Sequence, residues 1–543
     1  MAQKILILGG GFGGMFAARE LRKRLGGRAE IEIINNTNYF VFQPLLPEVG
    51  AGSITAMHAV SPLRKLLRGV RVRKARISSV DTDRKVVTVF QGVQRRPTEV
   101  TYDHLVVALG QGVDLTRTPG LADHALTMKT LDDARRLRAH VLERLEHADI
   151  TALPEVKREA LTFCIVGAGF SGIETAGELG EMIDRALGDY PNIKRSEIRI
   201  VLIEFMGRVL AELPETLATY AQKTLEDRGF EVMLNTGVKS ATGTSLETTT
   251  GEIIGTRTIV ATIGNTPSPV VQEMPLETRH GRIAVNRHLQ AQGAENVWSL
   301  GDCALIPMKE DATERGDFAP PTAQFAVREA RCLAQNIEAA IACRPLQPFE
   351  YTSQGALASL GAHRGVAEVW GMTFRGYPAW LLWRAYYLSF LPGFRTRITV
   401  LLNWFIDGFS RSTVQIRAED NNGARYVHYR AGDRVFEAGN RSDGVYSVIS
   451  GAVELRIADP ETGEERVSRI GPGEIFGDRV IFGKMQRTGT VRALENTQVL
   501  VLRREEVAKI ATGFAPFRDY FQRHMKEAYG VEWNPEDGIG PDR

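Results

Sequence analysis

The chain has 543 residues, of which 43% are hydrophobic and 24% are charged, and its formal net charge is +2. A length of this order predicts three or four domains, and the composition is that of an ordinary globular protein. The nearly balanced charge argues against a protein dedicated to nucleic acids, so we expect no nucleic-acid partner.

The cysteine pattern and the hydropathy exclude further classes. The cysteines are scattered and form no CxxC or other close pair: Cys164, Cys303, Cys332 and Cys343. We therefore expect a protein of a reducing compartment, without a disulfide framework and without a metal site. The N-terminus has no signal-peptide architecture, and no uncharged apolar run reaches the roughly 20 residues that span a bilayer. The sequence thus predicts a cytosolic protein, or one that sits on a membrane from the cytosolic side.

A glycine-rich motif opens the chain. The apolar run 4–8 breaks into Gly9-Gly10-Gly11-Phe12-Gly13-Gly14, and residues of helical composition follow. Strand, GxGxxG and helix is the arrangement that binds the pyrophosphate of a dinucleotide at the helix N-terminus. Gly9 permits the tight turn, Gly11 lets the backbone approach the phosphates, and Gly14 lets the helix pack against the strand. We expect Gly9, Gly11, Gly13 and Gly14 at a bound cofactor.

The same motif recurs about 160 residues later. An apolar run over 161–166 leads into Gly167-Ala168-Gly169-Phe170-Ser171-Gly172, and a helical stretch follows. Two dinucleotide folds in one chain indicate two nucleotides, one held as a prosthetic group and the other exchanged. This is the organisation of a flavoprotein that uses a pyridine nucleotide.

The residue that follows the second strand of each unit usually binds a ribose. Asn35 stands about 21 residues after Gly14, where an acid is usual; an amide still bonds a hydroxyl but without charge assistance, which leaves FAD retention open. In the second unit the strand 198–203 ends in Glu204, whose carboxylate favours NADH over NADPH. The alternative for Glu204 is a plain surface acid.

Three further turns complete the predicted cofactor sites. A buried strand ends at Gly110, and a similar strand ends at Gly264. An apolar strand then leads into Gly301-Asp302, which is how flavoproteins with two such folds present a carboxylate to the flavin's ribityl chain and pyrophosphate. A helix is predicted from about residue 322 to residue 342.

The most specific signals lie between these elements. They are Phe42-Gln43-Pro44-Leu45-Leu46, the segment 126–148, Gly172-Ile173-Glu174, Ala323-Gln324, Gly355-Ala356-Leu357-Ala358, and the tryptophan-rich segments 379–383 and 403–404. With these motifs, residues 1 to about 415 resemble a type II NADH:quinone oxidoreductase, a respiratory flavoenzyme that does not pump protons.

The resemblance implies that hydride passes from NADH to FAD and that a membrane quinone then reoxidises the flavin. Glu174 would lie beside the flavin and nicotinamide, and Gln324 where the quinone head group docks; Gln43 and Ala323 would contact the cofactor. A buried Glu174 with a raised pKa can relay protons, and the alternative is a helix-surface acid. The chain departs from the family at Asn35 and at Arg328, where a second glutamine is common.

The region 379–409 is aromatic and aliphatic with interspersed charges. One helical stripe is formed by Trp380, Trp383, Tyr387, Leu388 and Leu391. This pattern suits a helix in the headgroup region of a membrane, and equally a helix packed on the protein's own core. Because the family uses this region as a monotopic anchor, we expect a peripheral protein on the cytoplasmic face of the cell membrane, and a homodimer.

A separate module follows the polar linker 418–423. Its short strands have evenly spaced turn signals, which indicates a β-roll. With Gly471–Asp478 and Arg487 it resembles a cyclic nucleotide-binding domain: Gly477 belongs to the turn at the phosphate, Arg487 would pair with the phosphate, and Asp478 would accept from the ribose hydroxyl. Thr488 gives a hint of a guanine contact that does not choose between cAMP and cGMP.

The cyclic-nucleotide motif has one departure and one alternative. The family usually has Glu at the position of Asp478, and Arg479-Val480 follow in place of small and apolar residues. Two interpretations of this module therefore remain: it binds a cyclic nucleotide, or it is a degenerate interaction module. A helix is predicted over 505–529 without a helix-turn-helix, and the tail 531–543 is expected to be disordered.

The predicted fold class is α/β, with two Rossmann-like domains, a membrane-associating helical segment and an all-β roll. The expected domains are an FAD domain (1–125 and 265–350), an NADH domain (126–264), a C-terminal flavoprotein segment (351–416), and the roll (417–530). Two functions remain: an NADH:quinone oxidoreductase that a cyclic nucleotide regulates, or a cyclic-nucleotide sensor whose flavoprotein part is a scaffold or reduces a soluble acceptor.

Overall fold

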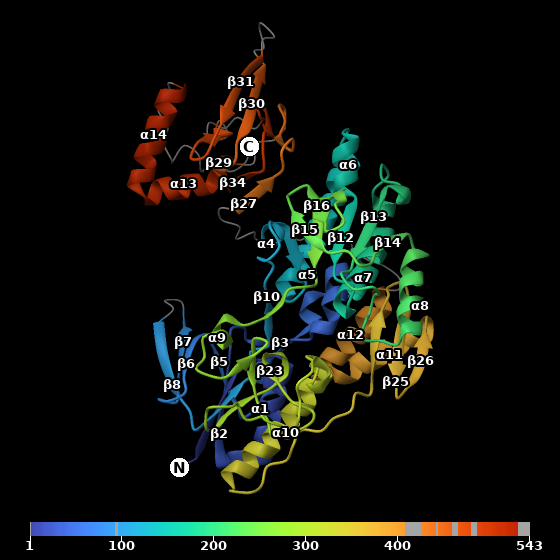
Figure 1. Cartoon of the computed structure of the whole chain (residues 1–543), viewed down its shortest axis with the longest axis vertical. Coiled ribbons are helices and arrows are strands. Elements are labelled where there is room, and N and C mark those ends of the chain that lie inside the picture. Colours follow the sequence, from blue (N-terminus) through green and yellow to red (C-terminus); the bar gives the residue numbers. More distant parts are fainter. Residues whose placement is uncertain are drawn as a thin grey trace.

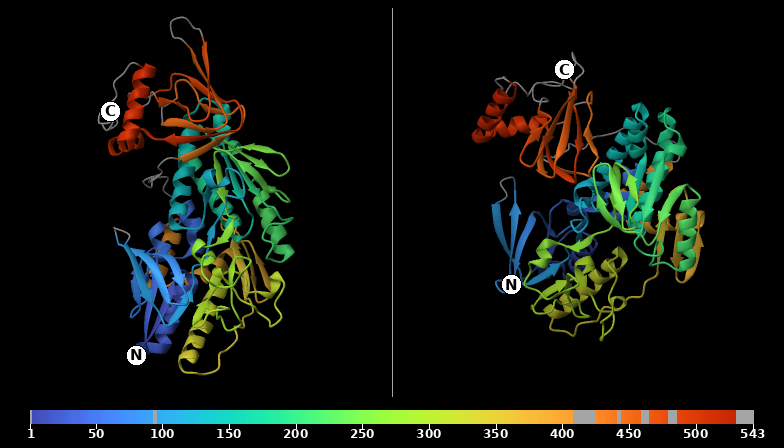
Figure 2. Two further views of the ribbon diagram at one scale, coloured as in Figure 1. Left: turned by 60° about the vertical axis from the view of Figure 1, so that its left-hand side comes forward. Right: turned by 45° about the horizontal axis from the view of Figure 1, so that its top comes forward.

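The computed structural model describes residues 2–92, 96–407, 425–440, 444–458, 465–478 and 486–529. These residues form two parallel sheets with helices, a small antiparallel sheet beside two helices, and a C-terminal β-roll at one end of the molecule (Figure 1, Figure 2). The expected α/β class with an added all-β roll is confirmed. The predicted linker 418–423, the pair 479–480 and the tail 531–543 lie outside the described residues.

The first parallel sheet is built from both early and late parts of the chain. Its five strands, in spatial order, are β22 (Val297–Ser299), β9 (His104–Val107), β1 (Gln3–Leu8), β2 (Ala29–Asn35) and β5 (Arg71–Lys74). Central parallel strands are covered on both faces, which is why β1 is a continuous apolar run and its side chains from Ile5 to Leu8 are fully buried. The glycine motif follows β1 and opens α1 (Phe12–Leu25), which packs against α10 (Ala323–Ile341).

Shorter elements surround this sheet. They are the antiparallel strands β6 (Arg76–Asp81), β7 (Val86–Gln91) and β8 (Arg96–Thr101), the pair β3 (Tyr39–Val41) and β4 (Val60–Pro62), the strands β20 (Thr278–Arg279), β21 (Arg282–Ala284) and β23 (Ala304–Leu305), and the helices α2 (Leu46–Ala51), α3 (Leu63–Leu66) and α9 (Pro269–Gln272).

The second parallel sheet repeats the plan. Its five strands are β11 (Ala125–Thr127), β18 (Thr258–Ala261), β12 (Thr162–Val166), β13 (Arg199–Ile203) and β14 (Phe230–Met233). The second glycine motif joins β12 to α7 (Phe170–Ala186). Around this sheet lie α5 (Leu131–Ile150), α6 (Pro154–Ala160), α8 (Glu215–Glu226) and the antiparallel strands β15 (Val238–Ala241), β16 (Ser245–Thr248) and β17 (Ile253–Gly255). Helix α5 begins at a capping box formed by Thr130 and Asp133.

Two crossovers connect the two parallel sheets. The first contains β10 (Gln111–Val113) and α4 (Leu121–His124), and the second contains β19 (Asn265–Pro267). Strands β10 and β19 pair antiparallel, so the two crossovers run side by side. A side chain at Gly264 would begin 2.6 Å from the carbonyl oxygen of Asp114, which explains the glycine there.

The C-terminal flavoprotein segment closes against the second glycine unit. It contains β24 (Gly355–Ser359), β25 (Gly365–Val369), β26 (Met372–Arg375), α11 (Tyr377–Phe390) and α12 (Phe394–Asp407). Helix α7 approaches it closely, since a side chain at Gly177 would begin 2.4 Å from the backbone carbon of Leu360. Among the described residues no helix is both long and apolar enough to cross a membrane.

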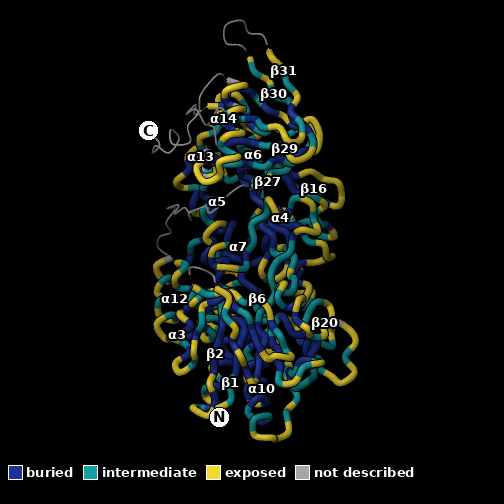
Figure 3. The backbone as a smooth tube through the Cα atoms, turned by 90° about the vertical axis from the view of Figure 1, so that its left-hand side faces the viewer, coloured by how far each residue is buried: buried dark blue, intermediate teal, exposed yellow. Residues whose placement is uncertain are grey.

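The β-roll consists of two four-stranded antiparallel sheets. One contains β27 (Arg425–Tyr429), β34 (Thr497–Leu502), β29 (Val445–Ser450) and β32 (Ile475–Phe476); the other contains β28 (Arg434–Phe436), β33 (Thr490–Ala493), β30 (Val453–Ala458) and β31 (Glu465–Ile470). Helices α13 (Arg504–Gly513) and α14 (Ala515–Tyr529) follow. Figure 3 shows buried residues inside the roll and at both parallel sheets. One buried cluster extends through both sheet units, whereas the roll has a core of its own.

Candidate active site

A cavity of about 670 Å³ lies where the strands of the first parallel sheet end. The glycine turn after β1, the end of β2, the turn at Gly301 and the first turn of α10 all contribute to its walls. Ligands of open α/β sheets bind at this edge. The expected site residues that line the cavity are Gly9, Gly11, Gly13, Asn35, Gln43, Gly110, Gly301, Asp302 and Ala323.

The first glycine turn has the shape that a dinucleotide requires. Gly9 has a φ of +101°, and a side chain there would begin 2.2 Å from the carbonyl oxygen of Ala108. A side chain at Gly14 would begin 1.9 Å from the carbonyl oxygen of Gly9. Helix α1 can therefore lie this close to the turn only because residue 14 is glycine. A side chain at Gly11, in contrast, would meet no atom from elsewhere in the described part of the chain within 4 Å. The backbone is therefore open for an approaching pyrophosphate, as FAD would present.

The second glycine turn repeats this geometry at the end of β12. A side chain at Gly172 would begin 1.8 Å from the carbonyl oxygen of Gly167, whereas the space beside Gly169 is open. Glu204, directly after β13, accepts from the backbone N–H groups of Ala168 (2.5 Å) and Met206 (2.8 Å). The structure thus brings Glu204 to the glycine turn in spite of the long spacing, because the extra residues form two short 3₁₀ helices at 187–189 and 195–197.

Asn35 uses its amide to fix the turn at the first cavity. Its Oδ1 accepts from the N–H of Gly10 (2.9 Å), and its Nδ2 donates to the carbonyl oxygen (3.1 Å) and the hydroxyl (2.9 Å) of Thr37. A carboxylate accepts only, and would leave both oxygens of Thr37 without this donor. The amide is therefore matched to its surroundings in this chain.

Glu329 is a site residue that the sequence reasoning missed. It lies on α10, is buried, and accepts from the N–H of Gly301 at 2.7 Å, so it holds the turn that carries Asp302. Burial raises the pKa of Glu329 to about 8, and burial also raises the pKa of Asp302. A detectable signal existed, because Glu329 is an acid within the apolar face of a helix otherwise formed by residues such as Phe325 and Leu333.

Glu174 is buried at the contact between α7 and the C-terminal segment. Its Oε1 accepts from the indole Nε1 of Trp383 at 2.7 Å and from the backbone N–H of Ser359 at 3.3 Å. Burial raises the pKa of its carboxyl to about 8, although both hydrogen bonds act to lower it. The alternative of a helix-surface acid is wrong, since only 6% of Glu174 is exposed.

Gln324 lies at the start of α10 and is held from several sides. Its Nε2 donates to the hydroxyl of Ser353 (3.1 Å) and to the carbonyl oxygen of Gly355 (3.2 Å), and the hydroxyl of Tyr351 donates to its Oε1 (3.1 Å). Arg328, one turn later, donates to the carbonyl oxygen of Gln324 and lies over the Tyr351 ring at 4.7 Å. A cation thus stands over an aromatic ring beside the predicted quinone residue.

The comparisons with known proteins cover almost the whole chain. Residues 3–330 match the family model described as pyridine nucleotide-disulphide oxidoreductase, residues 353–411 match the NDH2 C-terminal domain, and residues 426–512 match the cyclic nucleotide-binding domain. The chain is 30% identical over 434 residues to the type II NADH:quinone oxidoreductase Ndh of Mycobacterium tuberculosis, with 77% of this chain and 90% of that protein covered.

The chain belongs to the type II NADH:quinone oxidoreductases.

Other relatives agree with this family. The chain is 33% identical over 411 residues to the demethylphylloquinone reductase NdbB of Synechocystis, with 74% of this chain and 95% of that protein covered. The structure of NDH2 from Plasmodium falciparum in complex with NADH has the same fold, with a TM-score of 0.70, 19% identity, and coverage of 76% of this chain and all of that one. The membership decides for the enzyme and against a mere scaffold: the protein is an FAD-dependent oxidoreductase that transfers electrons from NADH to a quinone. When bound, FAD supplies the two-electron chemistry between these substrates.

The aromatic stripe of α11 does not face outward. Trp380, Trp383 and Leu391 are buried, and Tyr387 and Leu388 pack on the core. The structure therefore bears out the core-packing alternative for this stripe. Exposed apolar residues are few on α11 but form a series at helical spacing on α12: Phe394, Ile398, Leu401, Leu402, Phe405 and Ile406.

In the roll, the structure brings the predicted cyclic-nucleotide residues together. Arg487 is buried, donates to the carbonyl oxygens of Gly477 (2.8 Å) and Gly444 (2.9 Å), and lies over the Phe436 ring at 4.2 Å. Asp478 is also buried, whereas Thr488 is exposed.

Replacing Asn35 tests its part in holding the flavin. In Asn35→Ala the N–H of Gly10 loses its acceptor, so we expect FAD to dissociate about fivefold to tenfold more readily, as the loss of one or two hydrogen bonds predicts. The measurement is the flavin absorbance per protein after extensive dialysis. Asn35→Asp serves as control, because it keeps the acceptor for Gly10; an Ala variant that retains flavin like the wild type would contradict this role.

Proposed function

We propose that Glu174 is the proton donor for quinone reduction. The observation that carries this proposal is its burial together with a pKa of about 8, since such a carboxyl is mostly protonated at neutral pH and can give up a proton to a developing quinol. The indole of Trp383 orients the carboxyl. Tyr387, whose pKa is raised by burial and by Glu174, packs on Trp383 at a ring distance of 4.8 Å and extends this buried group along α11.

We assign quinone docking to the surface formed by Gln324, Arg328 and Tyr351. Phe390 supports this assignment, because Arg328 also lies over its ring at 5.6 Å and so links α10 to the end of α11. A cation at this place stabilises negative charge that develops on a quinone oxygen. On the nucleotide side, Gly167, Gly169, Gly172 and Glu204 are assigned to NADH, and the residues of the first cavity to FAD.

The division into domains follows from these assignments. We propose an FAD domain of residues 1–125 and 265–350, an NADH domain of 126–264, a C-terminal segment of 351–416 and a roll of 417–530. The homodimer stays a prediction.

The pH dependence of turnover tests Glu174. Because its folded pKa is raised to about 8, the carboxyl is protonated below this pH and ionised above it, so quinone turnover should fall as the pH rises through about 8. In Glu174→Gln this fall should disappear and turnover should be reduced about tenfold or more. The measurement is stopped-flow kinetics, in which NADH bleaches the flavin at the wild-type rate and only reoxidation by a short-chain quinone is slow. Wild-type reoxidation by the variant would remove Glu174 from the mechanism.

We further propose that α12 contacts a membrane on the cytoplasmic face. Its exposed apolar residues repeat at positions i, i+4, i+7, i+8, i+11 and i+12, which is one face of a helix, and 80% of Phe394 is exposed. Figure 3 shows exposed residues along this helix. A membrane at α12 also lies near the quinone surface, because α11 and α12 are packed together.

Vesicle flotation tests this contact. In Leu402→Ser with Phe405→Ser we expect binding to vesicles to fall at least about tenfold, because the two exposed apolar side chains no longer contribute the free energy of their transfer from water into the membrane. The control is Ile150→Ser with Ile253→Ser, which removes two exposed apolar side chains from the second sheet unit. Equal flotation of both variants would place the membrane contact elsewhere.

We also propose that cAMP or cGMP binds the roll through Arg487 and Asp478 and regulates the enzyme. The contact between the roll and the first crossover supports regulation. The backbone N–H of His428 donates to His124 Nε2 (3.2 Å), and Arg430 donates to Ser240 (2.9 Å) and Glu247 (3.2 Å). Strand β27 therefore touches α4, and Arg430, directly after β27, touches the β15–β16 hairpin. Helix α4 belongs to a crossover between the two parallel sheets.

Cutting this contact separates binding from regulation. The double variant His428→Ala with Arg430→Ala removes the ring that packs on His124 and the side-chain bonds to Ser240 and Glu247. We expect its cyclic-nucleotide affinity to persist in titration calorimetry, while the effect of the nucleotide on NADH:quinone turnover is lost. The control is Arg456→Ala, which breaks an ion pair with Glu454 inside the roll. Absence of heat with both nucleotides in the wild type would reject the effector, and an effect that survives in the double variant would reject this route.

A further inference from the structure

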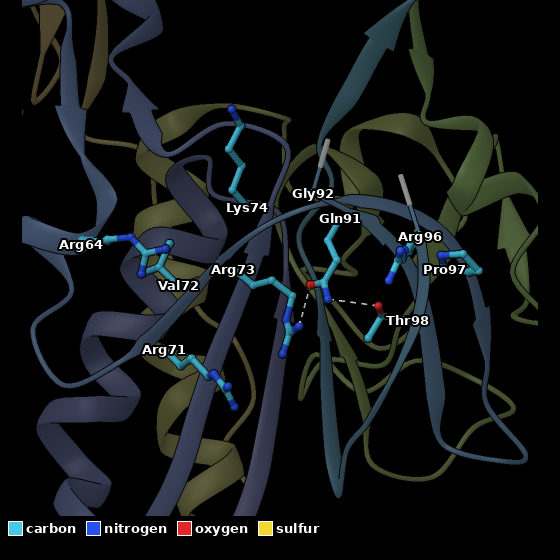
Figure 4. A pocket seen from close by; sticks show the side chains of 10 residues that line it. All are labelled: Arg64, Arg71, Val72, Arg73, Lys74, Gln91, Gly92, Arg96, Pro97 and Thr98. Carbon is cyan, nitrogen blue, oxygen red and sulfur yellow. Dashed lines mark hydrogen bonds between the residues drawn. The ribbon is translucent and has the colours of Figure 1, made fainter. Parts of the chain in front are cut away.

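A second cavity, of about 600 Å³, lies on the first sheet unit and shares no lining residue with the flavin cavity. It opens between the edge strand β5, helix α3 and the β7–β8 hairpin, and Figure 4 shows the side chains around it. Five of its lining residues are cations, and we call them the basic pocket: Arg64, Arg71, Arg73, Lys74 and Arg96.

The positive charge of the basic pocket is largely uncompensated. Among the described residues no acid lines it, and the carboxylate that pairs with two of its cations is the buried Glu32, which lies 2.5 Å from Arg73 and 3.9 Å from Arg71. Arg64, Lys74 and Arg96 form no ion pair with any residue in the described part of the chain. Several like charges around one concave surface raise the local concentration of anions.

The remaining side chains narrow the class of anion. Arg73 is steadied by Gln91 (2.8 Å), which in turn donates to Thr98 (3.0 Å), so this wall of the pocket is held in place. In the part of the chain that the structure describes, no aromatic ring lines the pocket to stack a base, and no acid lines it to accept from a ribose. The chemistry fits a phosphate ester rather than a nucleotide.

The position of the basic pocket indicates where that phosphate comes from. Helix α3, which carries Arg64, directly follows β4, and Ser61 of β4 lies within hydrogen-bond distance of Pro392 (3.3 Å) and Thr396 (3.2 Å) at the α11–α12 connection. A side chain at Gly393 would begin 3.9 Å from Leu66 of α3. The helix with the exposed apolar face and the helix at the pocket are therefore neighbours.

We propose that the basic pocket binds the phosphate head group of an anionic phospholipid. The inference rests on the proposed membrane contact of α12, and it adds a lipid specificity that an apolar helix face does not have. A basic residue near an anionic membrane surface strengthens binding about fivefold. Two such residues thus make the affinity for anionic vesicles differ from that for neutral ones by about 25-fold.

The test is flotation of the holoenzyme with vesicles of phosphatidylcholine alone and of phosphatidylcholine with phosphatidylglycerol. The wild type should bind the anionic vesicles more tightly than the neutral ones. In Arg64→Gln with Lys74→Gln the affinity for anionic vesicles should fall about 25-fold, while the affinity for neutral vesicles stays as in the wild type. The control is Lys23→Gln with Arg344→Gln, which removes the same charge from exposed positions outside the pocket. An equal loss in the control, or no gain in the wild type, overturns the proposal.

A second arm separates lipid from soluble phosphate. Inorganic phosphate and glycerol 1-phosphate are titrated into vesicle-free holoenzyme by calorimetry; micromolar binding that the pocket variant loses would overturn the lipid source in favour of a soluble ester. Failure of the α12 contact is recognised independently, because it abolishes binding to neutral vesicles as well. Turnover with a short-chain quinone in the absence of vesicles should be unchanged in every variant.

Discussion

The hydrogen bond between the Trp383 indole and the Glu174 carboxyl joins two distant parts of this chain. A carboxyl removed from water must be neutral or hydrogen-bonded, and Glu174 is stabilised in both ways, with a raised pKa and two N–H donors. One donor comes from α11 and the other from the end of β24. The C-terminal segment therefore completes the environment of a helix that starts at the second glycine turn.

A second pair of the same kind fixes α12. The indole of Trp404 donates to the buried Glu48 at 2.9 Å, and Arg384 lies between the rings of Trp380 (3.9 Å) and Trp404 (4.6 Å) while it approaches Glu48 at 3.8 Å. Both tryptophan bonds point inward. Because α11 and α12 use their tryptophans on the protein side, the aliphatic and phenylalanine residues of α12 are left on the outer face. The inner polar contacts thus orient the helix, and its exposed apolar residues face outward.

Three surface features are built from different elements of the structure: the apolar face of α12, the basic pocket and the roll. The apolar face of α12 and the basic pocket are neighbours through β4 and α3. A phospholipid likewise carries its charged head group beside its apolar chains, so the two surfaces match the two parts of one lipid. The roll lies at the other end of the molecule and touches the first crossover (Figure 1, Figure 2). A movement of the roll would therefore reach the connection between the two nucleotide sites before it reached either site.

The sequence by itself determined the two dinucleotide units, the Gly301-Asp302 turn and the roll. In these units much of the pattern depends on immediate neighbours: Gly14, for example, is required by the carbonyl oxygen of Gly9 in the preceding turn. Local spacing therefore carried the prediction. Glu204 was singled out in the same way, because it ends a strand, and its contact with the NADH ribose stays a prediction.

Only the tertiary structure decided the rest, because the deciding contacts join residues far apart in the chain. Amphipathic spacing on α11 could not tell core from membrane, and the choice depends on Glu174 and Glu48, which lie hundreds of residues earlier. The acid at 329 on an apolar helix face is visible in the sequence, but its contact with Gly301 is decided by the packing of α10, and the basic pocket forms only where β5, α3 and β8 meet. Burial and convergence of charge are properties of packing, and a single sequence records them only as patterns with more than one physical cause.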